Sequence, residues 1–142
     1  MRTRLVAAVL VASLFVPGVA HAGSQFDDLV MQPRYYVELA TCETNLNWDH
    51  STLSYTGGFG IYRQTFARWS SRSPKRGARG LSPREQAVIA DRIAWVGYTR
   101  ADGEYVYPVG PWGWGCVKMR KKLQRMICAS RDKRVQRWKR DC

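Results

Sequence analysis

Apolar residues recur every three or four positions in four parts of the chain. Such spacing places side chains on one face of a helix. It predicts helices over residues 33–46, 62–69, 82–97 and 119–127, and Val135 and Trp138 continue the last apolar face beyond Ser130. The residues that carry the four stripes are Tyr35, Leu39, Cys42 and Leu46; Tyr62, Phe66 and Trp69; Ile89, Ile93 and Val96; and Met119, Leu123, Met126 and Ile127.

The segments between these helices carry turn-forming residues. Residues 45–60 alternate weakly around Leu53 and Tyr55, which predicts a loop or short hairpin closing on Gly57-Gly58. Residues 70–80 have the composition of an exposed basic loop, and residues 98–115 that of an ordered loop rich in Gly, Pro and aromatic residues. Ser82, followed three residues later by Glu85, predicts a capping box, and Gly97 is a suitable helix terminator.

The first 22 residues have the pattern of a secretory signal peptide. Two arginines precede an apolar run, and Ala20-His21-Ala22 matches the small-residue cleavage pattern. Removing 22 of the 142 residues leaves 120, enough for one compact domain. No later run approaches the roughly 20 apolar residues that a membrane span needs. The sequence therefore predicts a secreted, extracellular protein.

Positive charge is concentrated at the C-terminal end. The whole chain has 23 Lys and Arg against 11 Asp and Glu, but residues 117–142 alone hold 11 basic and two acidic residues. Interleaved apolar residues argue against a disordered arm and favour a basic helical extension. Such a surface suits an anionic wall polymer or an anionic lipid surface. The extracellular location argues against a physiological nucleic-acid partner. The alternative to any specific binding role is a solvated helical face whose charge keeps the protein soluble.

Four cysteines remain in the mature chain: Cys42, Cys116, Cys128 and Cys142. An even number in a small exported protein favours two disulfides, for which three pairings are possible. The mature chain has one histidine, His50, and no Cys-x-x-Cys pair. These residues make a metal site or a Ser-His or Cys-His nucleophile improbable, and nothing in the sequence calls for a cofactor.

Glu43 is the first candidate for chemistry. It lies beside the apolar stripe of the first predicted helix and precedes a segment rich in Gly and aromatic residues that can wall off a cleft. A carboxyl that is shielded from water stays protonated more readily and can serve as a general acid. Glu38 and Asp49 compete for this role, and a glutamate on a helix is more often a surface residue.

Several motifs, taken in order, resemble the transglycosylase-like domain of resuscitation-promoting factors. The resemblance covers about residues 34–116, after a short lead over 23–33 and before the extension over 117–142. It rests on Ala40-Thr41-Cys42-Glu43-Thr44, Asn47-Trp48, Tyr55-Thr56-Gly57-Gly58-Phe59-Gly60-Ile61, Gln64-Thr65-Phe66, Glu85-Gln86, Ala90-Asp91-Arg92-Ile93 and Gly113-Trp114-Gly115-Cys116.

The resemblance implies a small, mostly helical, lysozyme-like α+β domain that acts on peptidoglycan in the cell wall. It implies that Glu43 is the catalytic acid, that Cys42 pairs with Cys116, and hence that Cys128 pairs with Cys142. A monomer that cleaves glycan strands is expected. Tyr55, Thr56, Gly58 and Gln64 are expected to line the substrate groove. The chain departs from the family at Gly60, where a glutamine is usual, and at Thr44-Asn45.

The sequence is compatible with either hydrolysis or transglycosylation. Glycosidases with two carboxylates need a second Asp or Glu about 5 to 9.5 Å from the acid, and Asp49 is the nearest candidate in sequence. In a lytic transglycosylase a hydroxyl of the substrate attacks instead, and a single acid suffices. The rival hypothesis is a non-catalytic, cationic wall-binding or membrane-active protein that keeps the fold.

Overall fold

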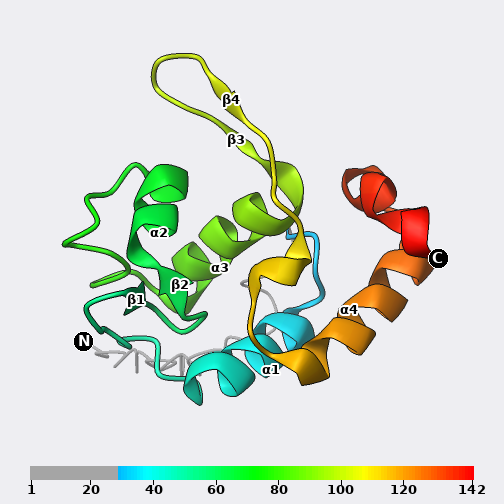
Figure 1. Ribbon diagram of the computed structural model, residues 1–142, viewed down its shortest axis with the longest axis horizontal. Coiled ribbons are helices and arrows are strands. Elements are labelled where there is room, and N and C mark those ends of the chain that lie inside the picture. Colours follow the sequence, from blue (N-terminus) through cyan, green and yellow to red (C-terminus); the bar gives the residue numbers. More distant parts are fainter. Residues whose placement is uncertain (1–28) are drawn as a thin grey trace, which may run out of the picture.

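The computed structural model describes residues 29–142, so the predicted signal peptide and most of the predicted lead lie outside the described residues. The described chain forms a small α+β domain, about half helical, with two small antiparallel hairpins (Figure 1). None of its helices has the length and apolar character needed to cross a membrane.

The first helix, α1 (Pro33–Thr44), begins with a proline in its first turn and ends where Asn45 adopts a left-handed conformation, with φ of 55°. Its buried residues are Tyr36, Leu39 and Ala40. The predicted stripe through Tyr35, Cys42 and Leu46 is therefore rotated by about one residue. Leu46 lies beyond the end of the helix and is 41% exposed.

A short hairpin follows α1, as predicted. Its strands are β1 (Tyr55–Thr56) and β2 (Ile61–Tyr62), paired antiparallel with Tyr55 opposite Tyr62. Residues 57–60 form the turn, and Gly57 there has a φ of 76°, which favours glycine. The next helix, α2 (Arg63–Ser70), buries Phe66 and Trp69.

The predicted helix over residues 82–97 consists of two parts. An α-helix, α3 (Pro83–Asp91), begins with the predicted capping box between Ser82 and Glu85. A π-helical turn, η2 (Arg92–Val96), continues it and ends at Gly97, whose φ is 73°. A Cβ at Gly97 would lie 2.5 Å from the carbonyl oxygen of Val106, so the chain needs glycine here for two reasons.

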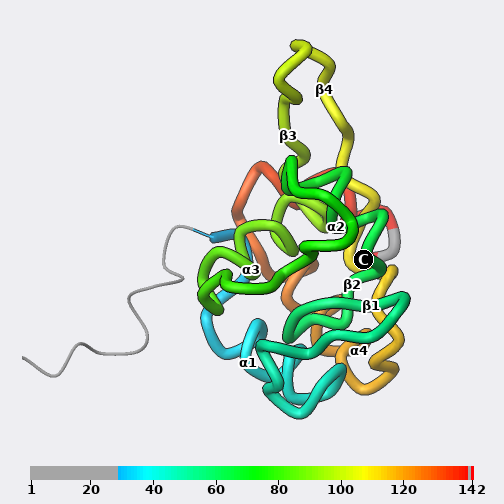
Figure 2. Tube along the Cα trace, turned by 90° about the vertical axis from the view of Figure 1, so that its left-hand side faces the viewer, coloured from blue at the N-terminus to red at the C-terminus, as the bar shows by residue number. Residues whose placement is uncertain are grey.

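Residues 98–115 contain a second hairpin that the sequence analysis did not predict. Its strands, β3 (Tyr98–Thr99) and β4 (Tyr105–Val106), pair antiparallel and project from the body of the domain (Figures 1 and 2). The composition of this segment, rich in Gly, Pro and aromatic residues, predicted an ordered loop and concealed the short turn at Asp102-Gly103 between the strands. A 3₁₀ turn, η3 (Pro111–Gly113), returns the chain toward α1.

The C-terminal segment is integrated into the domain. Helix α4 (Val117–Ala129) contacts α1, and the 3₁₀ helix η4 (Lys133–Asp141) contacts α4 and η2. Met119, Leu123, Ile127 and Val135 belong to the same buried core as the residues of α1 and α3. The basic extension predicted from its charge is thus helical, and it shares one core with the rest of the described chain.

Both disulfides have the pairing that the resemblance implied. Cys42 joins Cys116, with Cα atoms 5.9 Å apart, and Cys128 joins Cys142, with Cα atoms 5.5 Å apart. They close loops of 74 and 14 residues. Loop-closure entropy gives them roughly 4 and 3 kcal/mol of stabilisation. Disulfides persist in oxidising compartments, so these two bonds support an extracellular location.

Candidate functional site

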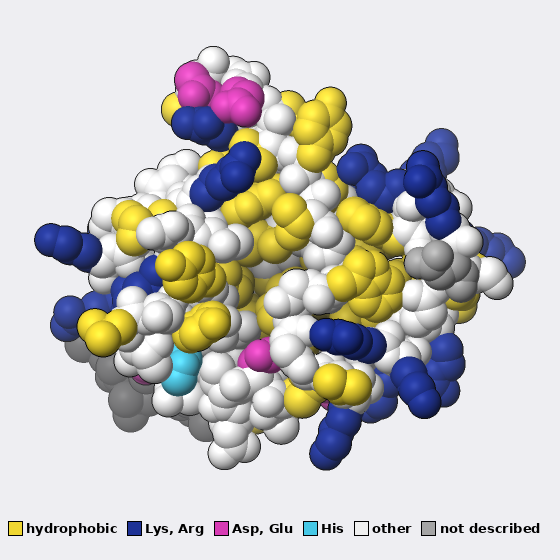
Figure 3. Space-filling view, viewed as in Figure 1, with side chains coloured by type: hydrophobic (Ala, Val, Ile, Leu, Met, Phe, Trp, Pro, Cys, Tyr) yellow, Lys and Arg dark blue, Asp and Glu magenta, His cyan; other side chains and the backbone are white. Residues whose placement is uncertain are grey.

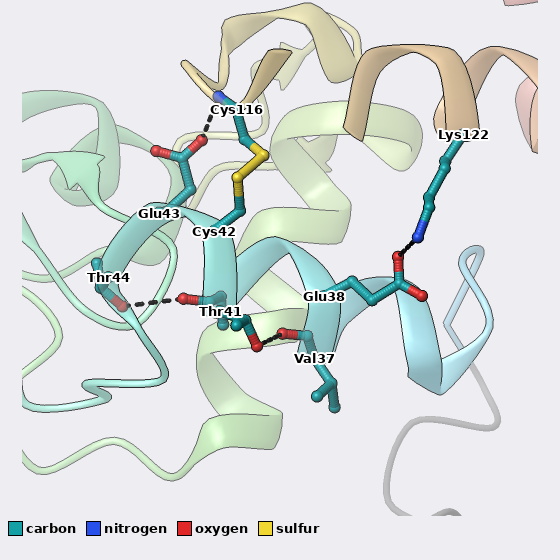
Figure 4. The surroundings of a disulfide bond; sticks show 9 residues. Val37, Glu38, Thr41, Cys42, Glu43, Thr44, Cys116 and Lys122 are labelled. Carbon is teal, nitrogen blue, oxygen red and sulfur yellow. Dashed lines mark hydrogen bonds and ion pairs between the residues drawn. A yellow bond between two sulfur atoms is a disulfide. The ribbon is translucent and has the colours of Figure 1, made fainter. Parts of the chain in front are cut away.

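Glu43 is fixed at the junction of α1 and α4. It is the penultimate residue of α1, next to the Cys42–Cys116 disulfide. The backbone N–H of Cys116, just before α4, donates a hydrogen bond of 2.8 Å to Oε1 of Glu43 (Figure 4). The disulfide ties Cys116 to the residue before Glu43, so the N–H that orients the carboxyl is itself covalently held beside α1.

The other oxygen of Glu43 lies between two glycines. A Cβ built on Gly60 would lie 3.7 Å from Oε2, and one built on Gly115 would lie 4.0 Å from the same atom. A longer side chain at either position would extend toward this oxygen. Because Oε1 already accepts a hydrogen bond from Cys116, Oε2 is the oxygen left to interact with a ligand.

Glu43 borders a hollow of about 740 Å³ between α1 and the start of α4. Its charged lining residues besides Glu43 are Glu38, Lys118 and Lys122. Glu38 forms an ion pair with Lys122 (Figure 4). One further acid and two cations therefore share this hollow with Glu43.

On the other side of Gly60 lies a groove of about 430 Å³ with a largely apolar lining. Four of its twelve lining residues are aromatic, and two of these, Tyr55 and Tyr62, remain 49% and 45% exposed. In Figure 3, hydrophobic side chains border the hollow in the middle of the view, and an acidic side chain is visible at its floor. The lining of the groove includes Tyr55, Tyr62, Val109 and Trp114.

The predicted substrate-binding residues are not brought together. Tyr55 lines the groove beside Gly60, but Gln64 borders a different hollow with Leu53 and Lys75. Thr56 is only 2% exposed, and its hydroxyl accepts a hydrogen bond of 2.8 Å from the N–H of Ala78. The buried hydroxyl of Thr56 thus anchors the loop over residues 73–80 through Ala78.

Gly58 is also buried, for a reason that the sequence alone does not reveal. A Cβ at this position would lie 2.4 Å from the ring of Trp48, so the glycine allows close packing of an indole. Its N–H donates a hydrogen bond of 2.8 Å to the side chain of Gln86. The ring of Trp48, and not an open groove, covers the face where a sugar was expected.

Gln86 belongs to the Glu85-Gln86 motif, but no role was predicted for it from the sequence. It is 1% exposed, and its amide also donates 3.0 Å hydrogen bonds to the carbonyls of Trp48 and Leu81. Three segments distant in sequence thus meet at one side chain, which holds the turn that ends at Gly60. A buried glutamine on the apolar side of a helix is the signal that identifies such a residue.

A second carboxylate for Glu43 is not evident among the described residues that line the adjoining hollows. Asp49 is exposed in the turns after α1 and borders neither the groove nor the hollow at Glu43. Glu38 borders the hollow but is paired with Lys122. Glu43 is therefore the carboxyl that combines a fixed orientation with an open approach.

Asp91 is the most perturbed acid of the described chain, but it lies away from Glu43 in the core. It is 4% exposed at the end of α3 and accepts hydrogen bonds from the Tyr36 hydroxyl and, at 3.1 Å, from the Val30 N–H. Burial raises its pKa to about 6, against the lowering effect of these two hydrogen bonds. Burial and Asp91 together raise the pKa of Tyr36 well above its ordinary value.

Within residues 29–142, no group of three or more His, Cys, Asp or Glu side chains is arranged to hold a metal ion. Comparison with protein-family models, curated proteins and solved structures finds no match for this chain.

Proposed function

We propose that this protein cleaves the glycan strands of peptidoglycan and that Glu43 is its general acid. The observation that carries the proposal is the orientation of the Glu43 carboxyl. Oε1 is held by the N–H of Cys116, and Oε2 faces Gly60 and Gly115, which carry no side chain that could cover it. A lysozyme-like organisation and an association with the cell wall remain predictions from the sequence resemblance.

The two sides of Glu43 suit different parts of a carbohydrate substrate. Sugar rings stack on aromatic faces, and the groove that begins at Gly60 offers exposed Tyr55 and Tyr62. The glycines allow a bulky ring to approach Oε2. A glycan that runs along the groove would therefore place one glycosidic oxygen near this atom.

In the proposed reaction, Oε2 of Glu43 donates its proton to the glycosidic oxygen while the bond from that oxygen to C1 breaks. The leaving sugar departs with a hydroxyl, and positive charge develops at C1 of the other sugar. The Glu43 carboxylate then removes a proton from the incoming nucleophile as it bonds to C1. A hydroxyl of the same sugar gives an anhydro end, and water gives a reducing end.

One acid that acts twice fits the described site better than two carboxylates. Asp49, the second carboxyl considered from the sequence, is exposed outside the hollow, and Glu38 is paired with Lys122. This arrangement favours attack by the substrate's own hydroxyl. We therefore expect anhydro ends to predominate among the products.

The test is release of soluble fragments from purified peptidoglycan by the mature chain and by Glu43→Gln. General acid catalysis contributes about 10²- to 10⁴-fold, so Glu43→Gln should lower the release rate by this factor. Glu104→Gln is the matched control, since Glu104 is exposed on the β3–β4 hairpin. Mass spectrometry distinguishes anhydro from reducing ends. Equal release by the wild-type and Glu43→Gln proteins would contradict the proposal.

The second candidate is a non-catalytic, cationic protein that binds the wall or an anionic membrane. The basic surface of α4 and η4 favours it, because residues 117–142 hold 11 basic and two acidic residues. In Figure 3 dark blue side chains gather on the side of the molecule where α4 and η4 lie. Absence of release by both proteins, each still folded and sedimenting with peptidoglycan, would favour this second function.

A further inference from the structure

The seam between α1 and α4 forms a trough that starts at Glu43 and continues away from it. The hollow at Glu43 shares Glu38 and Lys122 with a second hollow of about 530 Å³. Arg34 and Arg125 border this second hollow. We call the two together the basic trough, defined by Arg34, Glu38, Lys118, Lys122 and Arg125.

The positive charge of the basic trough is largely uncompensated. Lys118, Lys122 and Arg125 follow one another at spacings of four and three, so they lie on one face of α4. Like charges at these spacings destabilise a helix. Glu38 pairs with Lys122, but no ion pair joins Lys118 or Arg125 to an acidic side chain that the structure describes.

We infer that the basic trough binds the carboxylates of an acidic peptide branch carried by the sugar next to the cleaved bond. This inference rests on the proposed function. The trough begins at the Glu43 carboxyl. A group attached to the substrate close to the reacting atoms would therefore reach the trough during cleavage. An independent wall polymer has no such link to the bound glycan.

The length of the trough fits a branch better than a single anion. From Lys118 to Arg125 the helix rises about 10 Å, at about 1.5 Å per residue. Three cations spread over this length match an extended chain that bears more than one carboxylate. Lysine suits the role because its ammonium group attracts carboxylates without demanding a fixed geometry.

The experiment measures binding without turnover, in the mature Glu43→Gln protein. Its ligands are glycan strands that keep their peptide branches and the same strands after enzymatic removal of the branches. The trough variant is Lys118→Gln/Lys122→Gln/Arg125→Gln. The control is Lys133→Gln/Arg137→Gln/Arg140→Gln, which removes three exposed cations at the same spacings from η4.

We expect the trough variant to bind branched strands about tenfold more weakly at low salt, because exposed ion pairs contribute modestly and add up over three sites. Its affinity for bare strands should stay unchanged, and the control should bind both ligands as its parent does. Thermal unfolding checks that each variant is folded. If the triple variant does not fold, Lys118→Gln and Arg125→Gln singly should each give a two- to threefold loss.

Two results would contradict different parts of this argument. Equal losses on branched and bare strands, or the same loss in the control, would overturn the role of the basic trough while cleavage still depended on Glu43. Cleavage by the Glu43→Gln protein at the wild-type rate would instead overturn the proposed function, and with it the position of the cut bond beside the trough.

Discussion

Glu43 and Asp91 are both carboxylates near the C-terminal ends of helices, α1 and α3, but the fold places them in opposite surroundings. Glu43 is half-buried beside a hollow of about 740 Å³, and one of its oxygens is left open between two glycines. Asp91 is 4% exposed, with Tyr36 and Val30 donating to it. The acid whose pKa is raised to about 6 is Asp91.

A shifted carboxyl pKa and an open approach for a ligand are therefore separate properties in this protein. A raised pKa in a cleft often marks a catalytic acid, but burial raises the pKa of a structural acid by the same desolvation. Asp91 ties the chain entering α1 to the end of α3, and Arg134 and Asp132 of the C-terminal segment also act on it electrostatically. Its surroundings are those of a structural link, whereas those of Glu43 admit a ligand.

The largest effect should come from removing the disulfide beside Glu43. The double change Cys42→Ser/Cys116→Ser should lower the free energy of unfolding by roughly 4 kcal/mol, since it opens a loop of 74 residues. It should also lower peptidoglycan cleavage under conditions where the variant stays folded, because the disulfide holds residue 116 in place and the backbone N–H of this residue orients Glu43. Urea denaturation and the release assay measure the two effects. Unchanged cleavage by the folded variant would show that Glu43 needs no such support.

The second prediction concerns the pH dependence of stability through Asp91. The pKa of Asp91 is about 6 in the folded protein and about 3.8 in an unfolded chain. Between these values the folded state holds a proton that the unfolded state has lost, so this stabilisation is full below pH 4 and is lost as the pH rises to 6. The loss amounts to about 3 kcal/mol, at 1.36 kcal/mol per pKa unit.

The variant Asp91→Asn cannot ionise, and its amide oxygen can still accept from Tyr36 and Val30. From pH 3 to pH 7, its free energy of unfolding should therefore rise by about 3 kcal/mol relative to that of the wild type. Urea denaturation at a series of pH values measures this difference. A difference that is constant over this range would contradict an elevated pKa at Asp91. Cleavage of peptidoglycan should remain near the wild-type rate.

Removing the second disulfide, Cys128–Cys142, should lower stability without lowering cleavage. Cys128→Ser/Cys142→Ser opens a loop of only 14 residues, and the expected loss of stability is roughly 3 kcal/mol at most. Because this bond lies at the end of α4 away from Glu43, the release rate of the folded variant should stay close to that of the wild type. A fall as large as that caused by removing the first disulfide would show that the two ends of α4 are coupled.

The smallest expected effect tests the space around Oε2 of Glu43. A Cβ at position 115 would lie 4.0 Å from this oxygen, so Gly115→Ala and Gly115→Val place progressively more carbon near it. We expect stability within about 0.5 kcal/mol of the wild type, as at other exposed sites, and a graded loss of activity reaching about tenfold for valine. Full activity of both variants would place the substrate's approach elsewhere.

Much of the local structure follows from the sequence. Ser82 and Glu85 form the predicted capping box, the turn over residues 57–60 closes the predicted hairpin, and the four helical regions occur where the apolar spacing placed them. These features depend on neighbouring residues, so a local pattern suffices to predict them. The β3–β4 hairpin was missed because the Gly- and Pro-rich composition of residues 98–115 indicated a loop throughout.

The candidate site was predicted less completely, for a physical reason. Cys42 and Glu43 stand next to each other in the chain, so their motif was recognisable. The burial of Thr56 and Gly58, by contrast, depends on Ala78, Trp48 and Gln86, which come from other segments. No pattern around a turn indicates which distant side chain will cover it.

The sequence by itself determined the helices, the capping box and the concentration of basic residues after Cys116. Only the tertiary structure decided that Oε2 of Glu43 lies open between Gly60 and Gly115, that Asp91 is sealed in the core, and that the cations of α4 border the same hollow as Glu43. Helical periodicity and capping depend on contacts within a few residues. The environment of a carboxyl depends on elements that meet only when the chain has folded.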